Sequence, residues 1–138
     1  MLKVLCNGCF DVLHIGHVEH LEQAKSMGDT LIVALTEDHM VNKGPDRPFN
    51  IWSDRAKVLI ALESVDQVIQ TSSACEAIRT VKPDIFVKGI DYIGGDNFTE
   101  DVKAACYEVG AEIRYTDTVK RSASEIIRKI RGNDHSTI

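Results

Sequence analysis

Two histidines, His14 and His17, stand three residues apart with a glycine between them, at a point where the chain changes character. The apolar run 2–5 precedes them, and the amphipathic run 18–27 follows. This order predicts a strand, a turn and then a helix that begins near His17. Both imidazoles would meet at the helix N-terminus, where backbone N–H groups and the helix dipole attract anions. The pattern therefore predicts a phosphate site, and locally a nucleoside triphosphate site.

Two other kinds of site could use neighbouring residues. Histidines at this spacing can bind zinc, and Cys6 and Cys9 form a C-x-x-C pair just upstream that could complete a mixed site. The cysteines could also form a thioredoxin-like redox pair, although Asn7 and Gly8 between them favour a turn. Cys6 falls inside the predicted strand, where a small apolar side chain would serve equally well. We favour the phosphate site, and a zinc analysis would distinguish it from the mixed site.

The overall composition is that of one globular domain. The chain has 138 residues, of which 43% are hydrophobic and 27% charged, which is ordinary for such a domain. No apolar run approaches the roughly 20 residues that cross a bilayer. Residues 1–4 enter a strand at once, so we expect no signal peptide, a cytoplasmic location and four free cysteines. The net charge of -5 argues against a general nucleic-acid binder.

Strand and helix patterns alternate along the chain. Short apolar runs predict strands, and amphipathic runs with capping or stop residues predict helices. The predicted strands are a first strand that ends near Gly8, then 30–35, 67–70, 84–88 and 112–115; the predicted helices are the first, which begins near His17, then one with Ser53 as its N-cap, 74–81, 99–108 and 122–131. On the helix that begins at Ser53, the side chains expected to be buried are those of Ala56, Leu59, Ile60 and Leu62.

This alternation predicts an α/β fold, namely a single Rossmann-like doubly wound domain with a five-stranded parallel sheet. We place the domain at residues 1–131 and a short polar tail at 132–138. In such sheets, ligands bind at the carboxyl ends of strands, where the strand order reverses. Polar side chains follow three of the predicted strands, and we expect them to converge: Asp11, His14 and His17, then Lys43 and Arg47, then Lys88 and Asp91.

The segment from Gly8 to His17 resembles, without a gap, the first motif of the cytidylyltransferase-like nucleotidyltransferases. Residues 120–124, Lys-Arg-Ser-Ala-Ser, are similar to the second motif of that family, a Ser/Thr-rich helix start. The resemblance runs from about residue 4 to residue 130. Within the family, the start at 7–11 and the loop at 43–50 are most similar to heptose-1-phosphate adenylyltransferases. Glycerol-3-phosphate cytidylyltransferases are the nearest sister group.

The chain departs from both groups. Residues 117–120 stand where those cytidylyltransferases carry Arg-Thr-Glu-Gly, which favours ATP over CTP as the nucleotide. Residues 120–124 stand where the heptose enzymes carry Gly-Cys-Ser-Thr-Thr, and Ile90 replaces a glycine of their pattern. These differences leave the acceptor open, and the base with it.

The resemblance implies a reaction in which an oxygen of a phosphate monoester attacks the α-phosphorus of a nucleoside triphosphate and pyrophosphate leaves. A phosphate monoester is already anionic, so the enzyme must mainly align the reactants and neutralise charge. The resemblance implies that His14 and His17 hold the α- and β-phosphates, and that Lys43 approaches the α-phosphate from its loop. Magnesium would be carried by the triphosphate rather than by a protein metal site.

The resemblance assigns the other candidate residues to the nucleotide or to the acceptor. Gly16 would keep a side chain away from the phosphates, and Asp11 would orient a histidine or a magnesium-bound water. Arg55 would pair with a phosphate, with an ordinary surface arginine as the alternative. The candidate nucleotide-binding residues are Gly8, Cys9, Phe10, Asp11, Gly16, Lys88, Asp91, Ser122 and Ser124, and the candidates for the acceptor phosphate are Arg55, Lys120, Arg121 and also Lys88.

The expected partners are a nucleoside triphosphate and a small phosphorylated sugar or polyol, with no nucleic acid and no membrane, and we expect a homodimer. Two alternatives stay open: a glycerol-3-phosphate cytidylyltransferase, and a nucleotide-sensing domain that keeps the fold without turnover. The acidic charge and the short chain oppose a third, a tRNA-linked domain.

Overall fold

All five strands run parallel in one sheet, with the order β3-β2-β1-β4-β5. The computed structural model describes residues 1–41, 44–89 and 99–117. The strands are β1 (Lys3–Gly8), β2 (Thr30–Thr36), β3 (Gln67–Thr71), β4 (Ile85–Gly89) and β5 (Glu112–Thr116). The chain moves outward from β1 to β3 and then returns to β4 on the other side of β1. The strand order therefore reverses between β1 and β4, and a ligand is expected at their carboxyl ends.

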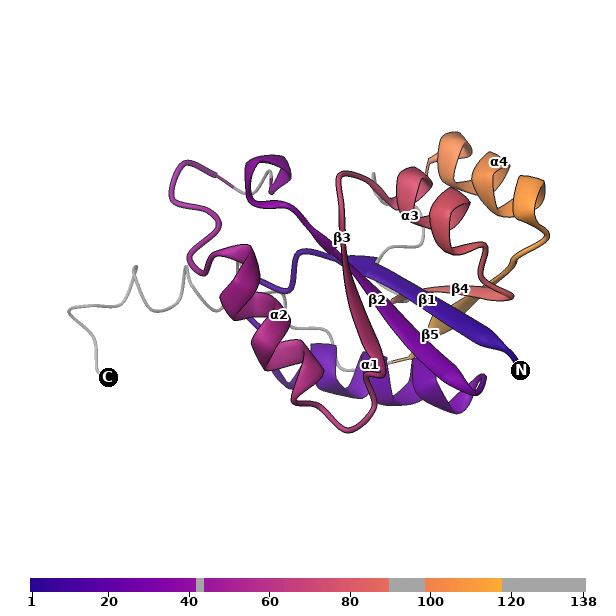
Figure 1. The fold of residues 1–138 in the computed structure, drawn as a ribbon, viewed down its shortest axis with the longest axis horizontal. Coiled ribbons are helices and arrows are strands. Elements are labelled where there is room, and N and C mark those ends of the chain that lie inside the picture. The colour runs from indigo at the N-terminus through magenta and orange to yellow at the C-terminus, as the bar shows by residue number, and fades with distance from the viewer. Residues whose placement is uncertain (42–43, 90–98, 118–138) are drawn as a thin grey trace.

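Helices cover both faces of this sheet (Figure 1). On one face, α1 (Ile15–Ser26) and α2 (Trp52–Ile60) share a core with Val4 and Cys6 of β1. On the other face, α3 (Ala74–Val81) and α4 (Glu100–Val109) pack on Leu5 of β1 and Phe86 of β4. Side chains alternate between the two cores along β1 because successive strand residues point to opposite faces. The predicted doubly wound α/β fold is confirmed.

Most element boundaries lie within one residue of the predictions, and the two that differ by two residues have local causes. Helix α1 begins at Ile15 rather than near His17, because the side chain of His14 caps it. The predicted N-cap at Ser53 is wrong: Ile51 holds that position, and the indole Nε1 of Trp52 donates to the Leu35 carbonyl at 3.0 Å, which docks the first residue of α2 on β2.

The buried side of α2 also differs from the prediction. Leu59 is buried and Ala56 and Leu62 pack against the core, but Ile60 is 48% exposed, so its predicted burial is wrong. Arg55 and Leu59, four residues apart, form the buried stripe, and a residue one step beyond Leu59 is rotated about 100° away from it. The predicted helix 122–131 and the tail 132–138 lie outside the described residues.

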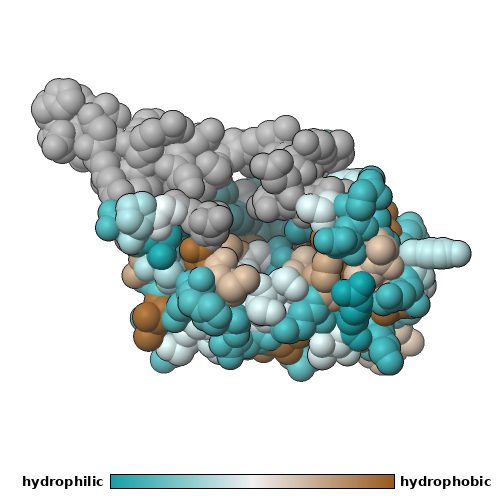
Figure 2. Space-filling view, turned by 90° about the horizontal axis from the view of Figure 1, so that it is seen from above, coloured by the Kyte–Doolittle hydropathy of each residue, from teal (hydrophilic) through white to brown (hydrophobic). Residues whose placement is uncertain are grey.

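The surface of the described residues is mixed in character. Figure 2 shows one face of the molecule, on which hydrophilic and hydrophobic residues are interspersed over the coloured part. Large exposed apolar side chains, such as Ile15, Val58 and Tyr107, come from three different helices, and scattered residues of this kind are normal. Within residues 1–41, 44–89 and 99–117, no helix is long and apolar enough to cross a membrane. All four cysteines are free thiols, as predicted.

Gly28 joins α1 to β2 at a point where the chain passes very close to β1. A Cβ atom at this position would lie 2.6 Å from Cγ2 of Val4 and 2.9 Å from the carbonyl oxygen of Leu2. We predict that Gly28→Ala lowers the free energy of unfolding by about 1–3 kcal/mol, because a rigid strand must move to accept the methyl group. Urea denaturation would measure this, with Lys57→Ala on the exposed side of α2 as the control. Coincident curves for Gly28→Ala and the wild type would contradict the prediction.

Candidate active site

The first turn of α1 is capped by the two motif histidines. Nδ1 of His14 accepts a hydrogen bond from the Gly16 N–H at 3.1 Å, and Nδ1 of His17 accepts one from the His14 N–H at 3.2 Å. A ring nitrogen that accepts carries no proton, so in each neutral imidazole the proton lies on Nε2. In this tautomer the Nε2–H of each ring is a hydrogen-bond donor, the kind of group that binds phosphate oxygens.

The two imidazoles are stacked, and Phe10 fixes the second one. The ring centroids of His14 and His17 are 3.9 Å apart with an interplanar angle of 27°, and the ring of Phe10 meets His17 edge-on at 5.1 Å. Phe10 has a positive φ of 47° and is 7% exposed. A Cβ atom at Gly8 would lie 2.9 Å from Cε2 of Phe10. Gly8 therefore makes room for Phe10, and Phe10 packs against His17; the predicted contact of either residue with nucleotide stays a prediction.

Gly16 lies in this turn, and Cys9 precedes it in the loop after β1. Gly16 is buried in the first turn of α1, and its N–H is the donor that holds His14. Cys9 is partly buried, and its carbonyl oxygen accepts a hydrogen bond from Arg55. Both residues shape the loop around the histidines, and their contact with nucleotide also stays a prediction.

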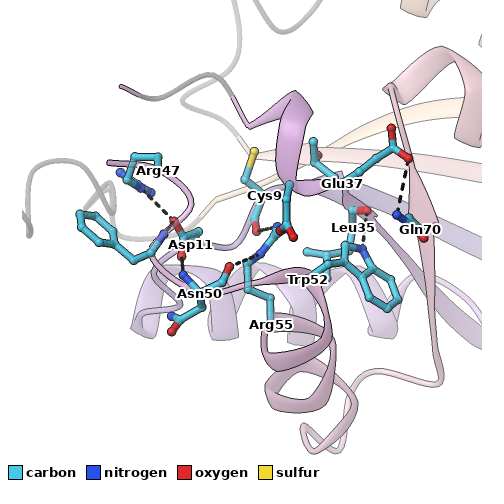
Figure 3. Close-up of polar contacts among 12 residues, drawn as sticks. Cys9, Asp11, Leu35, Glu37, Arg47, Asn50, Trp52, Arg55 and Gln70 are labelled. Atoms are coloured by element: carbon cyan, nitrogen blue, oxygen red, sulfur yellow. Dashed lines mark hydrogen bonds and ion pairs between the residues drawn. The ribbon is translucent and has the colours of Figure 1, made fainter. Parts of the chain in front are cut away.

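Asp11 is a fully buried carboxylate that fastens a second loop to the histidine loop (Figure 3). Its Oδ2 accepts from Nε of Arg47 at 2.9 Å and from the N–H of Phe49 at 2.7 Å, and its Oδ1 accepts from the N–H of Asn50 at 3.0 Å. Burial alone would raise the pKa of this carboxyl, but the three hydrogen bonds and the Arg47 charge lower the net pKa below its ordinary value. Asp11 is therefore ionised at neutral pH.

These contacts differ from the predicted role of Asp11. We expected its carboxylate to orient a histidine or a magnesium-bound water, whereas both of its oxygens accept hydrogen bonds from the segment 47–50. The structure thus shows that Asp11 holds two loops together, and its predicted role toward a histidine or a magnesium-bound water stays a prediction. The reason is tertiary: the loop after β1 and the loop before α2 meet at the carboxyl edge of the sheet.

Arg55 is buried and fully engaged by the protein, so the alternative of an ordinary surface arginine is wrong. Its side chain is 1% exposed. Nε donates to the Asn50 carbonyl at 2.9 Å and Nη1 donates to the Cys9 carbonyl at 2.9 Å (Figure 3). Nη2 pairs with Oδ1 of Asp38 at 2.6 Å. The predicted pairing of Arg55 with a phosphate stays a prediction, and its observed contacts are with three separate protein segments.

Lys88 brings a buried cationic group to the end of β4, the strand next to β1. The residue is 5% exposed, and its Nζ lies 5.4 Å from the ring centroid of Phe86. Burial lowers the pKa of the Lys88 ammonium, and the neighbouring thiols, chiefly that of Cys6, oppose that change. Lys88 thus lies where the strand order reverses, as the sequence predicted for a phosphate-binding group.

The zinc and redox alternatives lose support from this geometry. Burial raises the pKa of the Cys6 thiol to about 12, although the Lys88 charge acts in the opposite direction. Metal ligation and thiol–disulfide exchange both need a thiolate, which such a buried thiol does not readily form. In the part of the chain that the structure describes, no group of three His, Cys, Asp or Glu side chains is placed to hold a metal ion.

Sequence analysis and structure differ in which residues they place at the site. Asp38 is the residue that the sequence analysis misses; its position directly after β2, at the carboxyl edge of the sheet, was the available indication. The remaining candidates lie outside the described residues and stay predictions: Lys43, Asp91, Lys120, Arg121, Ser122 and Ser124.

Several known proteins are similar to this chain over most of its length. The chain is 44% identical over 140 residues to the bifunctional protein HldE of Sulfurimonas denitrificans, which covers 96% of this chain and 27% of that protein. It is 43% identical over 137 residues to the bifunctional protein HldE of Campylobacter fetus subsp. fetus, covering 94% of this chain and 28% of that protein. The chain therefore spans little more than a quarter of the length of these curated relatives.

A solved structure, that of the lipopolysaccharide core biosynthesis protein from Thermoplasma volcanium GSS1, has a TM-score of 0.74 and 26% sequence identity to this chain. The match covers 87% of this chain and 99% of that one. The family model described as cytidylyltransferase-like matches residues 5–137. Because that match takes in nearly the whole chain, including the histidine motif at the start of α1, the chain belongs to the cytidylyltransferase-like family.

Proposed function

We propose that this chain is a nucleotidyltransferase that transfers the adenylyl group of ATP to a small phosphorylated sugar, with release of pyrophosphate. The observation that carries the proposal is the pair His14 and His17 at the N-terminus of α1, with both Nδ1 atoms accepting backbone N–H groups and both Nε2 atoms left as the protonated positions. The similarity to the bifunctional HldE proteins supports the family. The resemblance to heptose-1-phosphate adenylyltransferases makes a heptose 1-phosphate the first acceptor to test.

In this proposal, the two imidazole rings lie between the N–H groups at the start of α1 and the ligand, and they donate to the ligand in place of those N–H groups. The N–H of Gly16, which would otherwise face an anion directly, donates to Nδ1 of His14. The N–H of His14 donates to Nδ1 of His17 in the same way. Each such bond polarises the ring and strengthens its Nε2–H as a donor. Triphosphate oxygens would therefore be met by imidazole edges set on the positive end of the helix dipole.

The acceptor phosphate supplies its own nucleophilic oxygen, so no strong general base is required. The protein must neutralise charge on the triphosphate and hold the two substrates in line. Lys88 is the described cation at the carboxyl end of β4. The sequence assigns the same task to Lys43, Lys120 and Arg121, and assigns hydroxyl donors to Ser122 and Ser124.

Magnesium belongs to the substrate in this proposal. The described residues offer no cluster of three acidic, histidine or cysteine side chains for a metal ion, and Mg²⁺ is commonly held largely by the phosphates of a nucleotide. In the proposed reaction, Mg²⁺ would be bound mainly by the phosphates of the nucleotide and not by a separate protein metal site. The homodimer and the cytoplasmic location stay predictions from the sequence.

We predict that His14→Ala and His17→Ala each lower kcat by roughly 100-fold or more, the loss that follows removal of one transition-state donor. Because His14 also caps α1, the melting temperature must be measured alongside, and His14→Asn, which keeps a capping side chain, separates the two roles. His39→Ala is the matched control, since that imidazole is 74% exposed and pairs only with Glu37 among the contacts described. Full activity of either alanine variant with an unchanged melting temperature would contradict the proposal that these histidines bind phosphate.

Lys43→Ala is predicted to lower kcat by more than it weakens ATP binding. A lysine that approaches the α-phosphate from a loop acts mainly on the transition state, in which charge moves toward the leaving pyrophosphate. Single-turnover rates together with calorimetric titration of ATP would separate the two effects. Equal losses in affinity and in rate constant would instead indicate uniform binding by Lys43.

The choice of nucleotide is tested by pyrophosphate release from ATP and from CTP with a panel of sugar and polyol phosphates. We predict that kcat/KM is higher with ATP, as the loop at 43–50 and residues 117–120 indicate. A tenfold preference for CTP, which corresponds to about 1.4 kcal/mol, would place the chain with the glycerol-3-phosphate cytidylyltransferases. Nucleotide binding without pyrophosphate release from any pair would leave a non-catalytic nucleotide-binding domain.

A further inference from the structure

We propose that Arg55 is a positioning residue for His17, which it holds in place through the loop at residues 9–11. The catalytic consequence rests on the proposed function, whereas the structural link does not. The link is a closed ring of contacts among Arg55, Asn50 and Asp11 that includes the backbone of the loop (Figure 3).

The ring can be followed atom by atom. Nη1 of Arg55 donates to the Cys9 carbonyl at 2.9 Å, and Nε of Arg55 donates to the Asn50 carbonyl at 2.9 Å. The N–H of Asn50 donates to Oδ1 of Asp11 at 3.0 Å, and Phe10 joins Asp11 back to Cys9 along the chain. The backbone of Asn50 is therefore held through both its N–H and its C=O, and the loop at 9–11 is held at both ends.

Phe10 is the residue between Cys9 and Asp11 in this ring of contacts, and its side chain contacts His17 directly. Its φ of 47° lies in the left-handed region, which residues other than glycine rarely adopt, so the surrounding contacts must maintain it. Its ring meets the imidazole of His17 edge-on, with centroids 5.1 Å apart and an interplanar angle of 68°. A shift of the Cys9 carbonyl would therefore move Phe10 and, with it, the orientation of His17.

Burial strengthens these hydrogen bonds, and the Arg55 guanidinium is bonded to the protein at all three of its nitrogens. The side chain of Arg55 is 1% exposed, and Asp11 is fully buried, so water does not compete for the bonds between them and the loops. Nη2 of Arg55 pairs with Asp38, whose side chain is 45% exposed. Asp38 is therefore partly exposed, unlike Arg55 and Asp11. Three nitrogens in a planar fork thus reach three segments, whereas a lysine carries all its donors on a single nitrogen.

Arg55→Lys tests the proposal because it keeps the charge and loses the fork. We expect kcat to fall by about 10- to 100-fold, the scale of a small misplacement of a catalytic group, while the Kd for ATP measured by calorimetry stays close to that of the wild type. The ¹⁵N and ¹³C imidazole resonances of His17, assigned by comparison with His17→Ala, should shift in the protein without nucleotide. Arg79→Lys is the matched control, since Arg79 is also an arginine on a helix that pairs with a carboxylate, that of Glu108, but its side chain is 49% exposed on α3.

The outcomes separate the possibilities. Weaker binding of ATP or of the acceptor phosphate with unmoved His17 resonances would make Arg55 a phosphate ligand and overturn the proposal. If Arg55→Lys does not fold, Asp38→Asn removes only the carboxylate that pairs with Nη2 of Arg55. It should shift the His17 resonances in the same direction by a smaller amount. Unmoved His17 resonances in Asp38→Asn would also overturn the proposal. Absence of pyrophosphate release by the wild type would contradict the proposed function alone, because the resonances need no turnover.

Discussion

The buried carboxylate of Asp11 is the interaction on which the carboxyl edge of this sheet depends. A charge without water is costly unless it is matched by an opposite charge and by hydrogen bonds. Asp11 has both, in the Arg47 guanidinium and the N–H groups of Phe49 and Asn50. These partners lie 36 to 39 residues further along the chain. One side chain therefore joins the loop that leads to the histidines with the loop that leads to α2.

At the start of α1, the same two imidazole rings cap the helix and, in the proposed function, meet the ligand. An aspartate cap would satisfy the helix N–H groups and end the hydrogen-bond chain there, because an ionised carboxylate only accepts. The imidazoles of His14 and His17 accept those N–H groups at Nδ1 and still carry a donor at Nε2. Histidine is the side chain that can do both in one neutral ring.

Periodicity and turn chemistry predict the sheet and its helices well, since those depend on neighbours in the sequence. Helix α3 has the predicted bounds, and β2 and β5 extend theirs by one residue. The error at Ser53 arises because a tertiary hydrogen bond from Trp52 to β2 starts the helix earlier than a capping residue would. A pattern of residue types contains no information on that bond.

The site is predictable in its position and less so in its internal contacts. Strand ends locate the histidines and Lys88 correctly at the edge where the strand order reverses. The burial of Arg55 could not be read from its sequence neighbourhood, because an isolated arginine on a helix is usually exposed. Its three partners come from separate segments, and Asp38 is recognised only once those segments are together.

These contacts also explain how a chain of net charge -5 can offer a site to a polyanion. Arg47 and Arg55 lie at the site, but each is neutralised by a carboxylate, Asp11 or Asp38, so both shape the loops without adding net positive charge. Among the described residues, the groups that would then attract phosphate in the proposed function are the imidazole donors, the dipole of α1 and the buried Lys88. Such groups act over short distances in surroundings that water screens weakly. Local donor geometry, and not the charge of the whole chain, therefore decides whether a small anion can bind here.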